Sequence, residues 1–378
     1  DMDYRKEFAD FEGVAYLDCA TQGAFPLSAA VAAKVALEWK KRPDQLPAGI
    51  YFDLPNRVRE KIAKLVGAEA ADIALTTGAT SGATAVAAGM DFKPGDEVLV
   101  AKGEFPMHFS TWVPYQRAGR MALRIIEPRG RFITADDYIE NLGPKTRLVS
   151  ASFVRFDNGA RLDAKKLAKT CRERGIAFLL DLSQGAGAVP IELTEWGVDF
   201  ATSSGYKWLL GPYGTGFFWV NPTAKTRLEL GPVYWMSIEG SDNFSGLPIT
   251  DLKVQGGARR WDAAETGSFS NLTALDASLD FVLRVGVEEI ARELRALVEE
   301  IIERLPRDRC VLASPAEAGQ RGPYVCVMAR KPEETALLHQ RLREAQVVAA
   351  MRENAIRISP YLYNTSDHVT RLIKALSL

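Results

Sequence analysis

The chain has 378 residues, of which 47% are hydrophobic and 25% are charged, and its formal net charge is −1. This composition is typical of a globular protein, and the length exceeds what a single hydrophobic core usually supports, so we expect two domains. The near balance of 47 basic and 48 acidic residues argues against nucleic acid or an anionic membrane surface as partners, because both are bound through a basic face.

Cysteine and histidine are scarce: the 4 cysteines and 3 histidines lie far apart in the sequence. Without a C-x-x-C pair or a histidine cluster, the sequence predicts neither a disulfide framework nor a metal site. We expect the cysteines to be buried thiols of a cytoplasmic protein. The charged N-terminus and the absence of a long apolar stretch predict neither a signal peptide nor a membrane-spanning helix.

Short apolar runs alternate with helical periodicity over most of the first 220 residues. Helices are predicted at residues 56–66, 79–90 and 164–174, and strands at residues 73–76, 97–101, 123–126, 147–152, 176–180, 198–203 and 216–220. Strands that alternate with helices predict βαβ units, and therefore an α/β fold with a mostly parallel sheet.

The periodicity stops between residues 231 and 264, where glycine, proline and polar residues surround four aromatic side chains that we expect to be exposed: Tyr234, Trp235, Phe244 and Trp261. A long aperiodic segment of this kind predicts a functional loop, a lid or a contact with a partner. One long helix is predicted at residues 274–304.

The remaining residues alternate again between the two patterns, with strands predicted at 324–328, 347–351 and 356–359 and helices at 334–345 and 366–378. This alternation predicts a smaller C-terminal α/β domain. We assign residues 16–265 to a large domain, and residues 1–15 and 266–378 to the small one.

Three places in the large domain combine residue types that suit catalysis. The first is the run from Thr76 to Gly82, where Ala79 and Thr80 open a helix directly after a strand. Free backbone N–H groups and the helix dipole favour phosphate at such a position, although an ordinary capped turn has the same appearance. Neither the G-x-G-x-x-G fingerprint nor a Walker A loop is present.

The second and third places follow two later strands. Asp181 ends the apolar strand at 176–180 and is followed by Gln184, which suits a ligand site of an open α/β sheet or, alternatively, an Asx-turn. Lys207 lies between Tyr206 and Trp208, after the strand at 198–203. Partial burial lowers the pKa of a lysine and suits it to form a Schiff base.

Together the three places match the three groups by which a protein binds pyridoxal phosphate, which are its phosphate, its pyridine nitrogen and its aldehyde. The chain resembles the class V aminotransferases of the fold type I pyridoxal-phosphate enzymes, in the branch with cysteine desulfurases, selenocysteine lyases and isopenicillin N epimerase-like proteins. The resemblance extends over nearly the whole chain, from Tyr16-Leu17-Asp18-Cys19-Ala20 through the blocks at Asp181 and Lys207 to the run from Arg357 to Thr365.

The resemblance implies a three-layer α/β sandwich with a mostly parallel central sheet, a pyridoxal phosphate cofactor and a homodimer with its active site between the subunits. It implies Lys207 as the Schiff-base lysine, Asp181 as the partner of the pyridine nitrogen, Gln184 at the phenolic oxygen, Ala79, Thr80 and Ser204 at the phosphate, Phe105 stacked on the ring and Arg357 at the substrate α-carboxylate. Tyr206 stands where many relatives have histidine, and Ser268 matches, more loosely, a residue that reaches the phosphate of the neighbouring subunit.

One departure from the family pattern narrows the range of reactions that we expect. Desulfurases carry a reactive cysteine between the positions of Val347 and Arg357, and none of the four cysteines of this chain lies there. We therefore expect amino-group transfer on an amino acid or a small amine. A cysteine-independent C–S lyase that works by β-elimination, an epimerase and a non-catalytic cofactor-binding protein remain as alternatives.

Overall fold

The computed structural model describes residues 3–265 and 268–378 of the chain. Seven of the strands in these residues form the central sheet, in the order β2-β8-β7-β6-β5-β3-β4. Their bounds are β2 Ile73–Thr76, β3 Glu97–Ala101, β4 Ala122–Ile126, β5 Thr146–Ser152, β6 Ala177–Asp181, β7 Phe200–Ser204 and β8 Gly216–Val220. Only β8 runs antiparallel to its neighbours, so the sheet is mostly parallel, as expected from the sequence.

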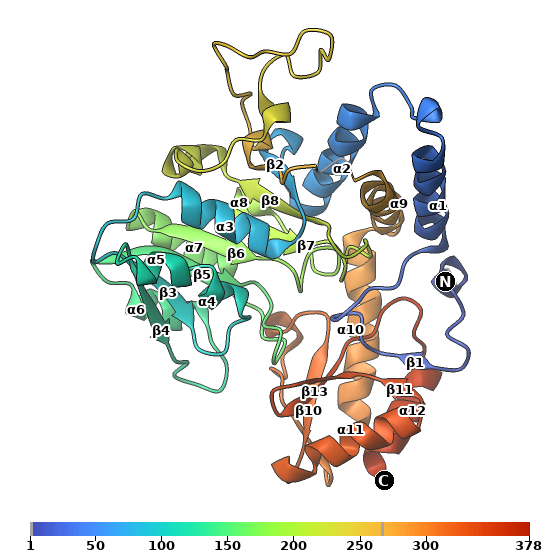
Figure 1. Cartoon of the computed structure of the whole chain (residues 1–378). Coiled ribbons are helices and arrows are strands. Elements are labelled where there is room, and N and C mark those ends of the chain that lie inside the picture. The colour runs from blue at the N-terminus through green and yellow to red at the C-terminus, as the bar shows by residue number, and fades with distance from the viewer. Residues whose placement is uncertain (1–2, 266–267) are drawn as a thin grey trace.

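Alternate side chains of each strand enter two separate cores, one on each face of the sheet. In β6, Phe178 and Leu180 belong to one core, whereas Ala177 and Leu179 belong to the other. Because both faces are covered, the strands read as continuous apolar runs, which is why the sequence predicted them closely. The sheet is therefore the middle layer of a three-layer α/β sandwich (Figure 1).

Helices close both faces. Residues of α2 (Ile50–Val66), α7 (Ala164–Glu173) and α9 (Phe269–Val285) pack into the first core, and residues of α3 (Ala79–Gly89) pack into the second. Shorter helices complete this part of the fold: α4 Met107–Ser110, α5 Val113–Arg117, α6 Ala135–Asn141 and α8 Leu193–Trp196. Helix α1 (Leu27–Lys41) lies beside α9 at the edge (Figure 1).

A second, smaller sheet has the order β12-β13-β10-β9, with β9 Cys310–Leu312, β10 Val325–Ala329, β12 Ala350–Arg352 and β13 Ala355–Ile358. Helices α10 (Val287–Arg304), α11 (Thr335–Glu344) and α12 (Ser366–Ser377) pack with it around a third core. The N-terminal β1 (Ala15–Tyr16) pairs with β11 (Val347–Val348). A smaller C-terminal α/β unit is thus present, and the exact boundary at residues 265 and 266 stays a prediction.

Two expectations about local structure were wrong, and one strand of the smaller sheet was not predicted. The helix predicted at 274–304 is two helices, α9 and α10, because Gly286 adopts a φ of +90° that ends one helix before the next begins. The strand predicted at 347–351 is split between β11 and β12, which pair with different partners. Strand β9 was not predicted, because it is short and only partly buried.

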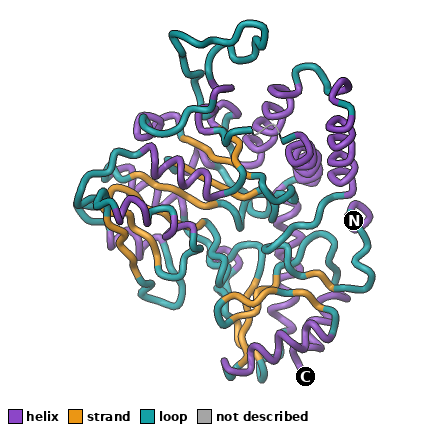
Figure 2. The backbone as a smooth tube through the Cα atoms, viewed as in Figure 1, coloured by secondary structure: helices purple, strands orange, loops and turns teal. Residues whose placement is uncertain are grey.

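The aperiodic segment at 231–264 lacks α-helices and named strands but contains the short 3₁₀ helices Trp235–Ser237 and Arg259–Trp261. The loop between them projects from the body of the molecule at the top of Figure 2. Trp235 and Phe244 are exposed as expected, whereas Tyr234 and Trp261 are buried, because this segment returns to pack on the central sheet unit.

Within residues 3–265 and 268–378, every helix is too short or too polar to span a membrane. The same residues hold no cluster of three or more histidine, cysteine or acidic side chains arranged to bind a metal ion. All four cysteines are free and buried, as the sequence predicted.

Candidate active site

A cavity of about 430 Å³ lies at the carboxyl ends of the central strands, where open α/β sheets bind ligands. It falls within the size range of small-molecule sites. Eight of the residues singled out in the sequence line it: Ala79, Thr80, Phe105, Asp181, Gln184, Ser204, Tyr206 and Lys207. The three separate places in the sequence therefore meet in one site, since β2, β6 and β7 end on the same edge of the sheet.

One end of the cavity is built from the start of α3 and the end of β7. Helix α3 begins at Ala79 and Thr80, whose N–H groups precede the first intrahelical hydrogen bonds. Gly82 lets this helix approach the sheet, because a Cβ there would lie 2.4 Å from Thr202 Oγ1. Across the gap, the buried hydroxyl of Ser204 has no hydrogen-bond partner among the described residues.

Lys207 reaches the cavity from the loop after β7 and is only 8% exposed. Its Nζ lies 5.5 Å from the centroid of the Phe105 ring and 5.6 Å from that of Tyr206. Burial, helped by the charges of Arg357 and Arg352 and opposed by the charge of Asp181, lowers the pKa of Lys207 to about 8. The uncharged, nucleophilic form of the amine is therefore much more populated near neutral pH than in an ordinary lysine.

Asp181, at the end of β6, is buried and held from two sides. Its Oδ1 accepts hydrogen bonds from the amide of Ser183 at 2.9 Å and from the Ser183 hydroxyl at 2.6 Å. Its Oδ2 lies 3.7 Å from Nε2 of His108. Burial raises the pKa of Asp181, but the contacts with His108 and Ser183 outweigh this effect. The pKa of Asp181 therefore lies below its ordinary value, and the carboxyl is ionised at neutral pH.

His108 is fully buried and was not among the residues singled out from the sequence. Because the Ser152 hydroxyl donates to Glu104 Oε2 at 2.6 Å, the Ser152 oxygen is left to accept from Nε2 of His108 at 3.1 Å. Burial lowers the pKa of His108, whereas the carboxylates of Glu104 and Asp181 raise it, and the net shift is upward. His108 therefore lies beside Asp181, where its positive charge, when it is protonated, stabilises the carboxylate.

Aromatic and amide groups form the walls of the cavity. Phe105, exposed at 39%, packs edge to face on Phe156, with centroids 5.3 Å apart. Gln184 donates through Nε2 to the carbonyl of Ala20 at 3.0 Å and accepts at Oε1 from the Trp208 indole at 2.9 Å. The second hydrogen on its Nε2 is free to reach a ligand.

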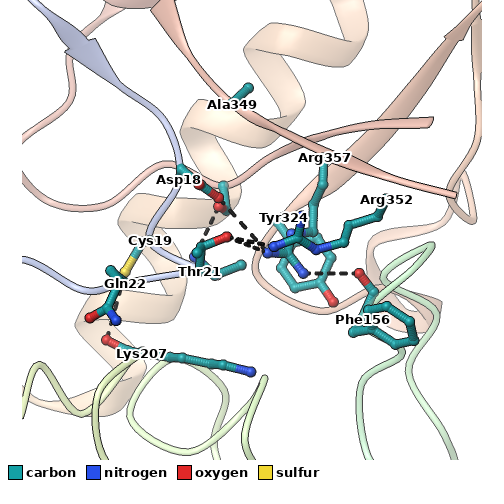
Figure 3. Close-up of polar contacts among 12 residues, drawn as sticks. Asp18, Cys19, Thr21, Gln22, Phe156, Lys207, Tyr324, Ala349, Arg352 and Arg357 are labelled. Carbon is teal, nitrogen blue, oxygen red and sulfur yellow. Dashed lines mark hydrogen bonds and ion pairs between the residues drawn. The ribbon is translucent and has the colours of Figure 1, made fainter. Parts of the chain in front are cut away.

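Arg357 lies beside the cavity and does not line it. Its guanidinium is 1% exposed and donates to the carbonyl of Phe156 at 3.1 Å and to the Thr21 hydroxyl at 2.8 Å. The nearest carboxylate, that of Asp18, is 3.8 Å away, and Nε has no partner among the described residues (Figure 3). A buried cation without a close counterion is suited to receive a carboxylate.

Ser268 does not reach the cavity of its own chain. It is exposed and lies directly before α9, and its neighbour Gly267 falls outside the described residues. The role expected for Ser268 concerns a neighbouring subunit and stays a prediction.

Comparison with known proteins places this site in a family. Residues 51–372 match the family model described as Aminotransferase class-V. The chain belongs to the class V aminotransferase family. This membership confirms the resemblance drawn from the sequence, together with the α/β fold and the pyridoxal phosphate that class V aminotransferases use.

Individual class V relatives carry different activities in their names. The chain is 26% identical over 319 residues to an uncharacterized aminotransferase, YcbU, of Bacillus subtilis, covering 84% of this chain and 82% of that one. It is 29% identical over 340 residues to isopenicillin N epimerase of Streptomyces clavuligerus, covering 85% and 83%.

Among solved structures, the cystine C–S lyase C-DES in complex with cysteine persulfide superposes with a TM-score of 0.84 at 21% identity, covering 97% of this chain and 98% of that one.

The residues of this class V cavity fit pyridoxal phosphate. The unpartnered Ser204 hydroxyl and the start of α3 offer donors for a phosphate at one end. The ionised Asp181 at the other end suits a protonated pyridine nitrogen. The amine of Lys207, with its lowered pKa, lies near the rings of Phe105 and Tyr206 on the wall of the same cavity.

The geometry also bears on the desulfurase reaction. Cys19 is the cysteine that contacts the active-site lysine, with its Sγ 3.9 Å from the backbone carbonyl of Lys207. It is completely buried, and this burial raises the pKa of its thiol far above the ordinary range. A sulfur-accepting cysteine must be an accessible thiolate, so Cys19 does not meet that requirement.

Proposed function

We propose that this protein transfers the amino group of an α-amino acid, using pyridoxal phosphate attached to Lys207. The observation that carries the proposal is the convergence of three groups with complementary charge on one cavity. These are the low-pKa amine of Lys207, the ionised carboxylate of Asp181 and the start of α3 with the open Ser204 hydroxyl. The buried Arg357 beside them suits the α-carboxylate of a substrate.

Each residue contributes a distinct physical task. Bound pyridoxal phosphate supplies an aldehyde that captures the substrate amine and a ring that withdraws electrons from Cα. With the cofactor bound, the amine of Lys207 would take the proton from Cα and return a proton to the product, because its pKa of about 8 suits both directions. Asp181 holds a proton at the pyridine nitrogen, and His108 keeps Asp181 ionised.

The proposed reaction is tested with purified holoprotein and a panel of L-amino acids, with and without an oxo-acid acceptor. Amino-group transfer predicts that the new amino acid accumulates in equal amount to the oxo acid of the donor. Release of pyruvate and ammonia without an acceptor indicates a lyase, and the appearance of the D-enantiomer indicates an epimerase. Either result, or no turnover of any amine, contradicts the proposal.

We also infer that the protein works as a homodimer in the cytoplasm, where its four free cysteines stay reduced. Helix α1 carries an exposed apolar stripe at the four-residue spacing of one helix face, formed by Leu27, Val31 and Val35. The projecting loop adds the exposed side chains of Phe244 and Ile249. The exposed apolar residues of these two segments favour a second copy of the chain as their partner.

Replacing Val31 and Val35 together with glutamate is expected to raise the dimer dissociation constant by on the order of 100-fold or more, because two apolar contacts are lost and two charges are buried. Size-exclusion chromatography with light scattering measures the mass across a dilution series. Lys40→Glu, on the opposite side of α1, is the matched charge control and should leave the dimer intact. A wild-type protein that is monomeric and fully active would disprove this assembly.

A further inference from the structure

Two arginines approach the active site from one hairpin of the small sheet. In the pairing of β12 with β13, Ala350 lies opposite Arg357 and Arg352 lies opposite Ala355. Side chains two residues apart on a strand share a face, and so do direct cross-strand partners. The register therefore places Arg352 and Arg357 on the same face of the hairpin, as diagonal neighbours.

Both guanidinium groups donate to the same atom. The Thr21 hydroxyl oxygen accepts from Arg357 at 2.8 Å and from Arg352 at 2.9 Å. Arg352 is otherwise held by the carbonyl of Met351 at 2.7 Å. Figure 3 shows the two side chains converging at Thr21, on the side of Lys207.

The positive charge of this pair is not balanced by the protein. Arg352 has no carboxylate within 4.0 Å in the part of the chain that the structure describes, and the carboxylate nearest to Arg357, that of Asp18, is 3.8 Å away. Burial lowers the pKa of Arg352, and the charge of Arg357 lowers it further, as expected for neighbouring like charges. Burial raises the pKa of Asp18, which weakens the negative charge of the carboxylate nearest to Arg357.

Diagonal like charges on a hairpin destabilise it unless an anion compensates them. Their field also reaches the reacting centre, since both arginines lower the pKa of Lys207. A ligand at Lys207 therefore lies within the field of two guanidiniums. One carboxylate of a ligand pairs with the N–H donors of one guanidinium. The donors of the other guanidinium are then left for a second acceptor group.

We propose that Arg352 binds a second acidic group, so that the substrate is an α-amino acid with an anionic side chain. The inference rests on the proposed function, in which Arg357 holds the α-carboxylate. Arg352 is partly exposed, whereas Arg357 is buried. The side-chain acid thus meets the outer arginine and the α-carboxylate meets the inner one.

Binding of unreactive acids to the holoprotein tests this assignment. Succinate against butyrate and glutarate against pentanoate are pairs of equal chain length that differ by one carboxylate and lack an amine. Calorimetry measures the dissociation constants, and the cofactor absorbance provides a second readout. Wild-type protein is expected to bind at least one diacid about tenfold or more tightly than its monoacid, the size of one charge-assisted hydrogen bond.

Variants then separate the two arginines. Arg352→Gln should abolish the preference for the diacid and leave the affinity for the monoacid unchanged, whereas Arg357→Gln should weaken both acids. Arg352→Lys keeps the charge without the planar fork and should retain part of the preference. Arg343→Gln, an exposed position on α11, controls for the loss of one positive charge and should change neither affinity.

Two results would overturn the assignment. If the wild type binds diacids and monoacids alike, the site holds no second acid. If Arg352→Gln weakens both acids equally, the two arginines hold a single carboxylate. A protein that retains pyridoxal phosphate on Lys207 but shows either result refutes only this inference, whereas a protein that does not bind the cofactor refutes the proposed function.

Discussion

Lys207→Ala is expected to lower kcat/KM by about 10⁴-fold or more, because the variant loses both the attachment point of the cofactor and the base at Cα. Lys207 lies beside Asp181 and the rings of Phe105 and Tyr206, and among the described residues no other amine lines the cavity to replace it. Borohydride reduction followed by peptide mass spectrometry should find pyridoxal phosphate fixed to Lys207 in the wild type and absent in the variant.

Two further variants test whether the loss of activity is specific to the amine of Lys207. Lys207→Arg keeps a positive charge and should be equally inactive, whereas Lys102→Ala, which removes an exposed lysine paired with Glu127, should keep full activity. Uptake of pyridoxal phosphate by wild-type apoprotein should accelerate as the pH rises through about 8, where the Lys207 amine loses its proton. Cofactor still reducible onto the chain in Lys207→Ala would make the assignment wrong.

Asp181→Asn is expected to lower kcat on the order of 10²–10³-fold, the effect of breaking a buried charge pair. Asparagine has the shape of aspartate but carries no charge, so it cannot hold a proton at the pyridine nitrogen. The His108 ring offers a readout that does not depend on turnover. Because Asp181 helps to raise the pKa of His108, the variant should lower that pKa, which NMR titration of the ring measures.

A matched variant controls for the chemical change. Asp163→Asn alters the exposed N-cap of α7, where asparagine caps as well as aspartate, and should leave both kcat and the His108 titration unchanged. Full activity of Asp181→Asn would remove Asp181 from the proposed mechanism. An unchanged pKa of His108 would show that the two side chains are not coupled.

The sequence predicted the central sheet well because its strands are buried on both faces. The runs at Ile73–Thr76, Glu97–Ala101 and Gly216–Val220 agree with β2, β3 and β8 residue for residue. The break at Gly286 was missed because helical periodicity continues on both sides of it. Burial of Tyr234 and Trp261 was missed because nothing in an aperiodic segment indicates that it returns to the core.

The presence or absence of a local signal in the sequence also separates the site residues that were predicted from those that were not. Asp181 and Lys207 stand out because each follows an apolar strand, and strand ends meet at one edge of a parallel sheet. His108, Thr21 and Arg352 carry no such signal. Their partners lie far along the chain or on the other strand of a hairpin, so only the packed structure brings them to Asp181 and Arg357.

The sequence by itself predicted the class of fold from local periodicity. Residue types at strand ends, together with the family resemblance, predicted the cofactor and singled out Lys207 as its proposed attachment point. The tertiary structure alone decided the charge around that lysine. Electrostatic energies depend on the distance between groups and on their burial, and neither quantity is written in the spacing of residues along a chain. The buried His108 behind Asp181 and the paired guanidiniums at Thr21 are both products of that packing.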